Sequence, residues 1–183
     1  MTEYEAIDAL LRGNINGLGV LVRLYQLKAV RAAFLITHDE NIAQDVVQNA
    51  FLRVADRIEQ YDRQRPFAPW FMRIVINDAI KAVQRKPRWL SFERGKIDFQ
   101  EKLQSHHPSP ENTIMDEQMQ QTIWETLTEL TPKQRAAVVM RYYLDMGEKE
   151  MAVQLDIAPG TVKWRLHAAR ERLRQLLTAE VNG

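Results

Sequence analysis

Apolar residues recur at helical spacing through the first part of the chain. Between Val20 and Arg65 there is neither Gly nor Pro, and a polar break at residues 37–40 divides this span in two. Apolar positions three and four residues apart form one face of a helix, which a core can cover. The two stripes consist of Leu21, Val22, Tyr25, Val30, Ala33 and Phe34, and of Ile42, Val46, Val47, Ala50, Phe51, Val54 and Ile58. The pattern therefore predicts two long helices, the second starting at a capping box formed by Thr37 and Glu40.

A third long helix and a short opening helix complete this first part. Pro66 suits the first position of a helix because its φ is already helical, and the pattern continues to about Arg85. A polar loop at residues 61–65 precedes it. The opening helix is predicted around Tyr4, Ile7, Leu10 and Leu11. We therefore expect a helical bundle over residues 1–87, which ends because Lys86-Pro87 stops the last helix.

The hydrophobic pattern changes after this bundle. Residues 88–110 lack sustained periodicity and end in a cluster of Pro, Ser and His, which predicts a linker. Helical spacing resumes near Asn112. We therefore expect a second helical domain over residues 111–183.

The second domain contains the clearest local signals in the chain. Thr131 suits an N-cap, Pro132 the first helical position, and Gln134 the second half of a capping box. A helix of about eight residues, a three-residue turn at 156–158 and a long basic helix from Pro159 follow. This order is typical of a helix-turn-helix, whose second helix can enter the major groove of DNA.

Composition indicates an all-α protein with two helical domains joined by a linker. Gly and Pro number 7 each, roughly 8% of the 183 residues, against about 12% on average. The chain has no Cys, which excludes disulfides and thiol-ligated zinc. No apolar run approaches the ~20 residues of a membrane span, and there is no signal-peptide core. We therefore expect a cytoplasmic protein without membrane insertion, metal or cofactor.

Charge is distributed unevenly along the chain. Residues 1–90 carry 13 Lys and Arg against 10 acids, residues 91–130 carry 3 against 8, and residues 131–183 carry 9 against 6. Two basic segments separated by an acidic one indicate two contact surfaces for a polyanion. The alternative for either segment alone is an ordinary solvated helix face.

Known catalytic patterns do not occur in the sequence. There is no H-E-x-x-H or G-x-x-x-x-G-K-[ST] motif, and no Glu is followed by His three residues later. Of the four histidines, His106 and His107 lie in the predicted linker and His167 on the basic helix. We therefore predict a binding protein and not an enzyme.

Three stretches resemble the bacterial sigma factors of the extracytoplasmic-function (ECF) group, which contain only the σ2 and σ4 domains. Residues 43–52 (AQDVVQNAFL) resemble the σ2 helix that grips RNA polymerase, and residues 61–77 resemble the promoter-opening loop and helix. Residues 130–132 and 160–170 resemble σ4. The resemblance implies core RNA polymerase, through its β′ clamp helices and β flap, and promoter DNA as partners, together with an anti-sigma factor. The alternative is a helix-turn-helix regulator that binds duplex DNA without docking on polymerase.

The resemblance implies that the helix after Asp39 docks on polymerase. An exposed leucine flanked by an acid and an amide suits a partner helix, although single exposed leucines are also normal on surfaces. The candidates are Asp45, Gln48, Phe51, Leu52 and Asp56.

Aromatic residues alternate with cations between residues 61 and 85. Rings can stack on unpaired bases while guanidinium groups hold phosphates, and the resemblance implies that the loop captures a base of the minus-ten element. The alternative is that Phe67, Trp70 and Phe71 belong to the core. The minus-ten candidates are Tyr61, Asp62, Arg63, Gln64, Arg65, Phe67, Trp70, Arg73, Asn77, Lys81 and Arg85.

The start of the last helix is the candidate for duplex recognition. Lys and Arg reach guanine acceptors or phosphates from a helix in the major groove, and the resemblance implies the minus-thirty-five element as the target. Gln134 and Arg141 on the supporting helix are candidates for phosphate contact. The full set is Gln134, Arg141, Thr161, Lys163, Trp164, Arg165, His167 and Arg170.

Overall fold

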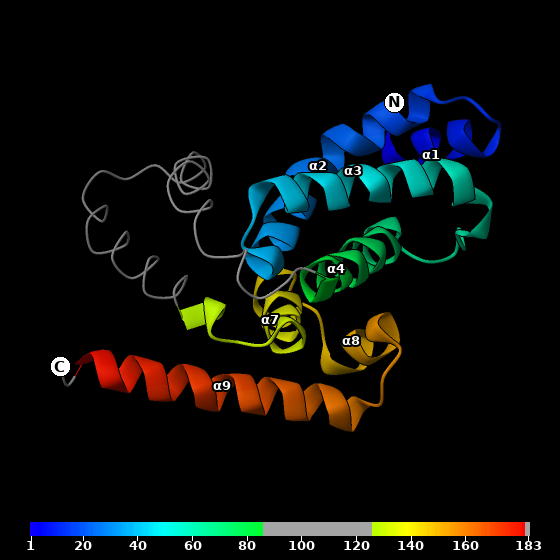
Figure 1. Ribbon diagram of the computed structural model, residues 1–183. Helices are drawn as coiled ribbons and strands as arrows, with labels where there is room; N and C mark the ends of the chain where they lie inside the picture. The colour runs from blue at the N-terminus through cyan, green and yellow to red at the C-terminus, as the bar shows by residue number, and fades with distance from the viewer. Residues whose placement is uncertain (86–125, 182–183) are drawn as a thin grey trace, which may run out of the picture. The chain divides into compact units, whose positions relative to one another are not determined.

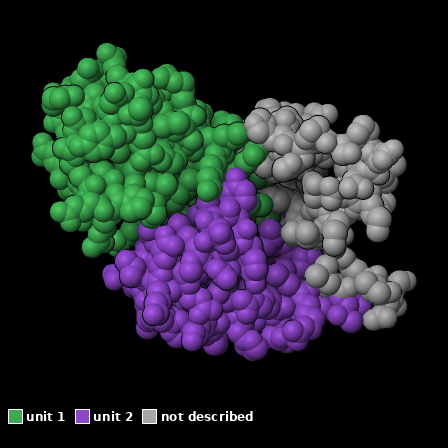
Figure 2. All heavy atoms as spheres, turned by 180° about the vertical axis from the view of Figure 1, so that it is seen from behind, with its two compact units in different colours: residues 1–85 green, residues 86–183 purple. Residues whose placement is uncertain are grey.

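The computed structural model describes residues 1–85 and 126–181, which form helices in two compact units (Figure 1). The units divide between Arg85 and Lys86 and are coloured separately in Figure 2. The fold class predicted from the sequence, all-α in two helical domains, is confirmed. The predicted linker and the helix expected near Asn112 lie outside the described residues.

Four helices build the first unit. They are α1 (Glu3–Leu11), α2 (Asn16–Thr37), α3 (Glu40–Arg57) and α4 (Phe67–Arg85), with a 3₁₀ turn, η1 (Ile58–Gln60), after α3. Helix α2 packs against α1, α3 and α4, and α3 packs against α4. Their apolar faces bury most of the predicted stripe residues, and Phe34, Phe67 and Phe71 are among the largest enclosed side chains. The stripe residues that are only half-buried are Val22, Tyr25, Val30 and Ile42. The two long helices expected from the sequence are therefore confirmed, although α2 begins before Val20 and includes Gly17 and Gly19.

Helix α1 lies unusually close to α2 because of Gly17. A Cβ at this position would lie 2.2 Å from the carbonyl oxygen of Ala6, so no other residue fits without a backbone shift. The start of α1 is held by a capping box between Thr2 and Glu5. The hydroxyl of Tyr25 on α2 also donates to the carboxylate of Glu3. These contacts fix the position of α1 on the bundle.

Two predicted helix starts differ from the structure. The Thr37–Glu40 capping box is wrong, because Thr37 is the buried last residue of α2 and Asp39 is the N-cap of α3. The carboxylate of Asp39 accepts a hydrogen bond from the Ile42 amide at 2.9 Å, as an N-cap does. Helix α4 begins at Phe67, one residue after the predicted Pro66.

The second unit contains a helix-turn-helix. Its described elements are α7 (Pro132–Val138), a π-helical turn η2 (Val139–Tyr143), α8 (Glu148–Leu155) and α9 (Pro159–Val181). The predicted capping box at Thr131 and Gln134 is confirmed. The continuous helix expected from Pro132 to Tyr143 instead widens to π geometry in its second half, where the Leu144 amide donates to the Val139 carbonyl.

The turn between α8 and α9 depends on Asp156. This residue caps α8 in the left-handed conformation, with φ of 53°, which Asp adopts more easily than most residues. Helix α9 then packs on α7 and α8 through the buried side chains of Val162, Leu166 and Ala169. The opposite face of α9 is left to solvent. Within the described residues, no helix has both the length and the apolar character that a membrane crossing needs.

Candidate polymerase and nucleic-acid interfaces

The predicted docking face on α3 is exposed, with one exception. Asp45, Gln48, Leu52 and Asp56 are open to solvent, and Leu52 is 53% exposed. Phe51 is instead 5% exposed and stacks on Phe71, with ring centroids 4.5 Å apart. The prediction that Phe51 contacts a partner is therefore wrong for this conformation, because its side chain belongs to the core of the bundle.

A groove of about 790 Å³ runs between α3 and α4 beside this face. Asp45 and Leu52 line its α3 side, whereas Lys81 and Arg85 line its α4 side. Asp78 lies in the groove and pairs with Arg53 at 2.9 Å and with Lys81 at 4.0 Å. The structure therefore brings two cations predicted to bind DNA next to residues predicted to bind polymerase, which sequence order does not indicate.

Aromatic residues at the base of the loop form a cluster with the core. Tyr61 is 9% exposed, and its ring lies 5.5 Å from that of Phe67 and 5.3 Å from that of Trp70. Its hydroxyl donates to the carbonyl of Arg65, and burial raises the pKa of Tyr61, with smaller contributions from Glu3 and Asp62. The prediction that Tyr61 and Phe67 stack on a base is wrong for this conformation, because both rings are enclosed. Tyr61 shapes the loop from beneath.

Polar residues form the outer part of the loop. Asp62, Arg63, Gln64 and Arg65 are all exposed. The Asp62 carboxylate pairs with the Arg65 guanidinium at 3.2 Å and accepts a hydrogen bond from the backbone N–H of Gln64 at 3.0 Å. Arg63 reaches Tyr4 and Asp8 on α1. Sequence reasoning missed these two α1 residues, because nothing local indicates a contact across more than fifty positions.

Helix α4 carries a polar stripe beyond the loop. Trp70, Arg73, Asn77, Lys81 and Arg85 are spaced by three or four residues, so they share one face of the helix. Arg73, Lys81 and Arg85 are exposed, and Trp70 and Asn77 are half-buried. A cationic stripe of this length can follow a nucleic-acid backbone.

The outer face of α9 is basic and exposed. Lys163, Trp164, His167 and Arg170 all lie on it, with Trp164 64% exposed. No acidic residue occurs between Pro159 and Arg170. Thr161 and Arg165 are half-buried at its edge, and burial lowers the pKa of Arg165.

Several polar residues around α9 already have hydrogen-bond partners within the second unit. The exposed hydroxyl of Tyr142 accepts a hydrogen bond from Arg170 Nε at 3.0 Å, a contact that sequence reasoning missed. The predicted phosphate contacts Gln134 and Arg141 also have intramolecular partners. Gln134 Oε1 accepts from the Thr131 amide at 3.0 Å, and Arg141 Nη1 donates to the Met146 carbonyl at 3.0 Å.

The residues that the structure describes form no metal centre. Among the described residues, no group of three or more His, Asp or Glu side chains is placed to hold an ion. The exposed groups instead suit contact with a protein on α3 and with a polyanion on the loop, α4 and α9.

Comparisons with known proteins identify both units. Residues 21–88 match the family model for sigma-70 region 2, and residues 120–173 match that for sigma-70 region 4. The RNA polymerase sigma-E factor of Streptomyces coelicolor is 30% identical over 158 residues, which cover 86% of this chain and 84% of that protein. The ECF RNA polymerase sigma factor SigW of Bacillus subtilis is 26% identical over 178 residues, covering 94% and 95%.

Solved structures agree on the fold. CnrH, in complex with the cytosolic domain of CnrY, superposes with a TM-score of 0.67 at 22% identity, covering 95% of this chain and 96% of that one. The sigma factor RpoE of Bartonella quintana, in complex with the anti-sigma factor NepR, gives 0.64 at 20% identity, covering 87% and 96%. Because the chain contains both region 2 and region 4, the alternative of a helix-turn-helix regulator that binds duplex DNA without docking on polymerase is not favoured. The chain belongs to the ECF group of the sigma-70 family, whose members direct RNA polymerase to promoters.

Proposed function

We propose that this sigma factor uses three separate surfaces during promoter recognition. The exposed face of α3 docks on the β′ clamp helices of core polymerase, the loop at 61–65 with α4 engages the minus-ten element, and α9 reads the minus-thirty-five element. The domain limits 1–87, 88–110 and 111–183 belong to this proposal, with the linker keeping the domains at promoter spacing. The second unit also meets the β flap, and the protein works in the cytoplasm, without catalytic activity of its own.

The α3 surface suits a protein partner better than DNA. Asp45 and Asp56 would repel phosphates, whereas Leu52 offers apolar area to a helix. The cations of α4 sit on the other side of the groove, so a strand passing along α4 would lie beside a polymerase element docked on α3. Polymerase binding and minus-ten contact can therefore occur together.

The observation that carries the proposal is the face that α9 leaves open. Val162, Leu166 and Ala169 fix the helix to its neighbours, so Lys163, His167 and Arg170 must point outward. A helix that starts at a helix-turn-helix corner presents its first turns to the major groove. Lys and Arg there can read guanine, and the exposed Trp164 can contact a thymine methyl group.

A protein inhibitor is also part of the proposal. One of the structures with the same fold is a complex with an anti-sigma factor. The α3 face and the basic face of α9 are both exposed in this chain, so a partner that covers them would block polymerase and DNA together. We therefore expect an anti-sigma factor to regulate this protein.

In vitro transcription from a library of random promoter sequences tests this function. Core polymerase with the purified chain should enrich templates that share two short blocks of conserved bases, one near minus ten and one near minus thirty-five. Core polymerase alone is the control. Enrichment of a single block, or of none, would contradict the division of promoter reading between the two units.

A further inference from the structure

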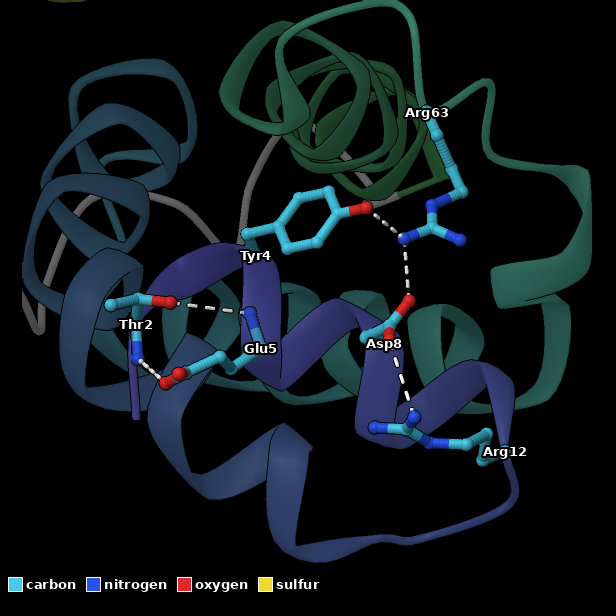
Figure 3. Close-up of polar contacts among 6 residues, drawn as sticks. All are labelled: Thr2, Tyr4, Glu5, Asp8, Arg12 and Arg63. Atoms are coloured by element: carbon cyan, nitrogen blue, oxygen red, sulfur yellow. Dashed lines mark hydrogen bonds and ion pairs between the residues drawn. The ribbon is translucent and has the colours of Figure 1, made fainter.

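The loop at residues 61–65 is tied to helix α1 through one side chain. Arg63 Nη2 donates to the hydroxyl of Tyr4 at 2.7 Å and pairs with the carboxylate of Asp8. The guanidinium carbon also lies 5.0 Å from the centre of the Tyr4 ring, within cation–π range. Figure 3 shows Arg63 pointing from the loop toward both α1 residues.

Helix α1 is a firm support for this contact. It packs closely on α2 at Gly17, and the Tyr25 hydroxyl donates to the carboxylate of Glu3. Asp8 is itself held on its other oxygen by Arg12, at 3.4 Å (Figure 3). Tyr4 and Asp8 therefore present a fixed pair of groups to the loop.

The contact leaves part of the guanidinium open. A guanidinium has five N–H donors, and the contacts made within residues 1–85 engage Nη2 alone. The side chain of Arg63 is 43% exposed, and the N–H groups of Nε and Nη1 remain as donors. Each of these N–H groups can donate a single hydrogen bond to an acceptor on a base.

We propose that Tyr4 and Asp8 are positioning residues for Arg63 in minus-ten recognition. They orient its remaining donors, Nε and Nη1, before DNA arrives, so the loop does not have to immobilise a long side chain on binding. This inference rests on the proposed role of the loop in minus-ten contact. Asp8 does not have to leave Arg63 for the contact to form, because the two ligands use different nitrogens. Asp8 therefore assists DNA binding instead of competing with it.

Binding of single-stranded minus-ten oligonucleotides to reconstituted holoenzyme tests the inference. The measured quantity is the ratio of Kd values for a one-base variant and for the sequence found in the library experiment. Asp8→Asn frees the side chain of Arg63, which must then be immobilised on binding, and this cost should lower the ratio by about 2- to 12-fold. Arg63→Ala should lower it at least as much, and the double variant should equal Arg63→Ala.

Controls separate positioning from charge and from folding. Glu5→Gln makes the same charge change on α1 without touching the loop, and should leave the ratio unchanged. Should Asp8→Asn fail to fold, Tyr4→Ala serves instead, because Tyr4 is an exposed side chain whose loss removes both the ring and the hydroxyl from Arg63.

Each outcome decides one claim. An unchanged ratio in Asp8→Asn with a lowered ratio in Arg63→Ala overturns the inference alone. Tighter binding of both oligonucleotides by Asp8→Asn also overturns it, since Asp8 would then be a competitor. An unchanged ratio in Arg63→Ala overturns the minus-ten role proposed for this part of the loop.

Discussion

The buried Arg135 on α7 holds the start of the helix-turn-helix unit together. Its Nε donates to the Leu127 carbonyl at 3.0 Å, and its Nη2 donates to the carbonyls of Thr128 and Leu130 at 3.2 and 3.0 Å. The residue is 7% exposed, and burial lowers its pKa to about 10. We predict that Arg135→Met destabilises this unit while leaving the first unit intact.

The size of this destabilisation follows from the backbone carbonyls that lose Arg135 as their hydrogen-bond donor. Leu127 and Leu130 are buried residues, whereas Thr128 is exposed and its carbonyl can bind water instead. The Leu127 carbonyl also accepts from the Leu130 backbone amide at 3.2 Å, so the Leu130 carbonyl is the buried one that loses its donor. One buried carbonyl without a partner costs about 1–3 kcal/mol. Removing the guanidinium recovers its desolvation cost and offsets part of this loss, so we expect a net loss of about 1–2 kcal/mol.

Hydrogen exchange of the full chain is the assay, because it reports local opening free energies for each unit separately. Amides of α7 and α9 should lose about 1–2 kcal/mol of protection in Arg135→Met, and those of α2 and α3 should not change. Arg174→Met is the matched control. That arginine is exposed, so its loss should cost less than about 0.5 kcal/mol. Equal protection of α7 in the two variants would refute the reasoning.

Three further predictions test other parts of the molecule. Burial of Tyr25, followed by its hydrogen bond to Glu3, raises the pKa of the phenol above its ordinary value of 10.0. The protonated phenol therefore gives its full contribution to stability below pH 10, and this contribution is lost as the pH rises beyond that value. The urea midpoint should therefore fall less between pH 8.5 and 11 in Tyr25→Phe than in the parent. Leu52→Asp should weaken binding to core polymerase about tenfold or more in a fluorescence titration, because it places a charge at the centre of the docking face. Lys163→Ala and Arg170→Ala should each weaken holoenzyme binding to minus-thirty-five duplex by about 1–3 kcal/mol.

Matched variants accompany these tests. Leu24→Asp charges an equally exposed apolar residue on α2 and should leave polymerase binding intact, so equal losses in Leu24→Asp and Leu52→Asp would argue against an α3 docking face. Arg174→Ala controls the α9 variants. Equal losses on scrambled duplex would mean that Lys163 and Arg170 contact phosphate only. An unchanged pH dependence in Tyr25→Phe would contradict the linkage argument.

Helix positions could be predicted from sequence where the signal is local. The apolar stripes and the Thr131 capping box depend on residues a few positions apart, and the helices lie where these patterns placed them. The capping box at Thr37 failed for a local reason as well. Asp39 is an equally good cap two residues later, and the sequence alone does not say where α2 ends.

The candidate surfaces were less predictable because burial depends on distant packing. Phe51 and Leu52 are neighbours in sequence, yet one lies in the core and the other in solvent. Tyr61 occupies a polar loop but is covered by rings from α4. The contact of Arg63 with Asp8 joins residues 55 positions apart, so only the folded bundle brings them together.

Mapping the 5′ ends of RNA made on one selected promoter tests the central claim most directly. Core polymerase with the chain should give RNA that starts at one defined position, and the start should disappear when the chain is left out. Scattered starts, or the same starts with and without the chain, would contradict the assignment of promoter selection to this protein.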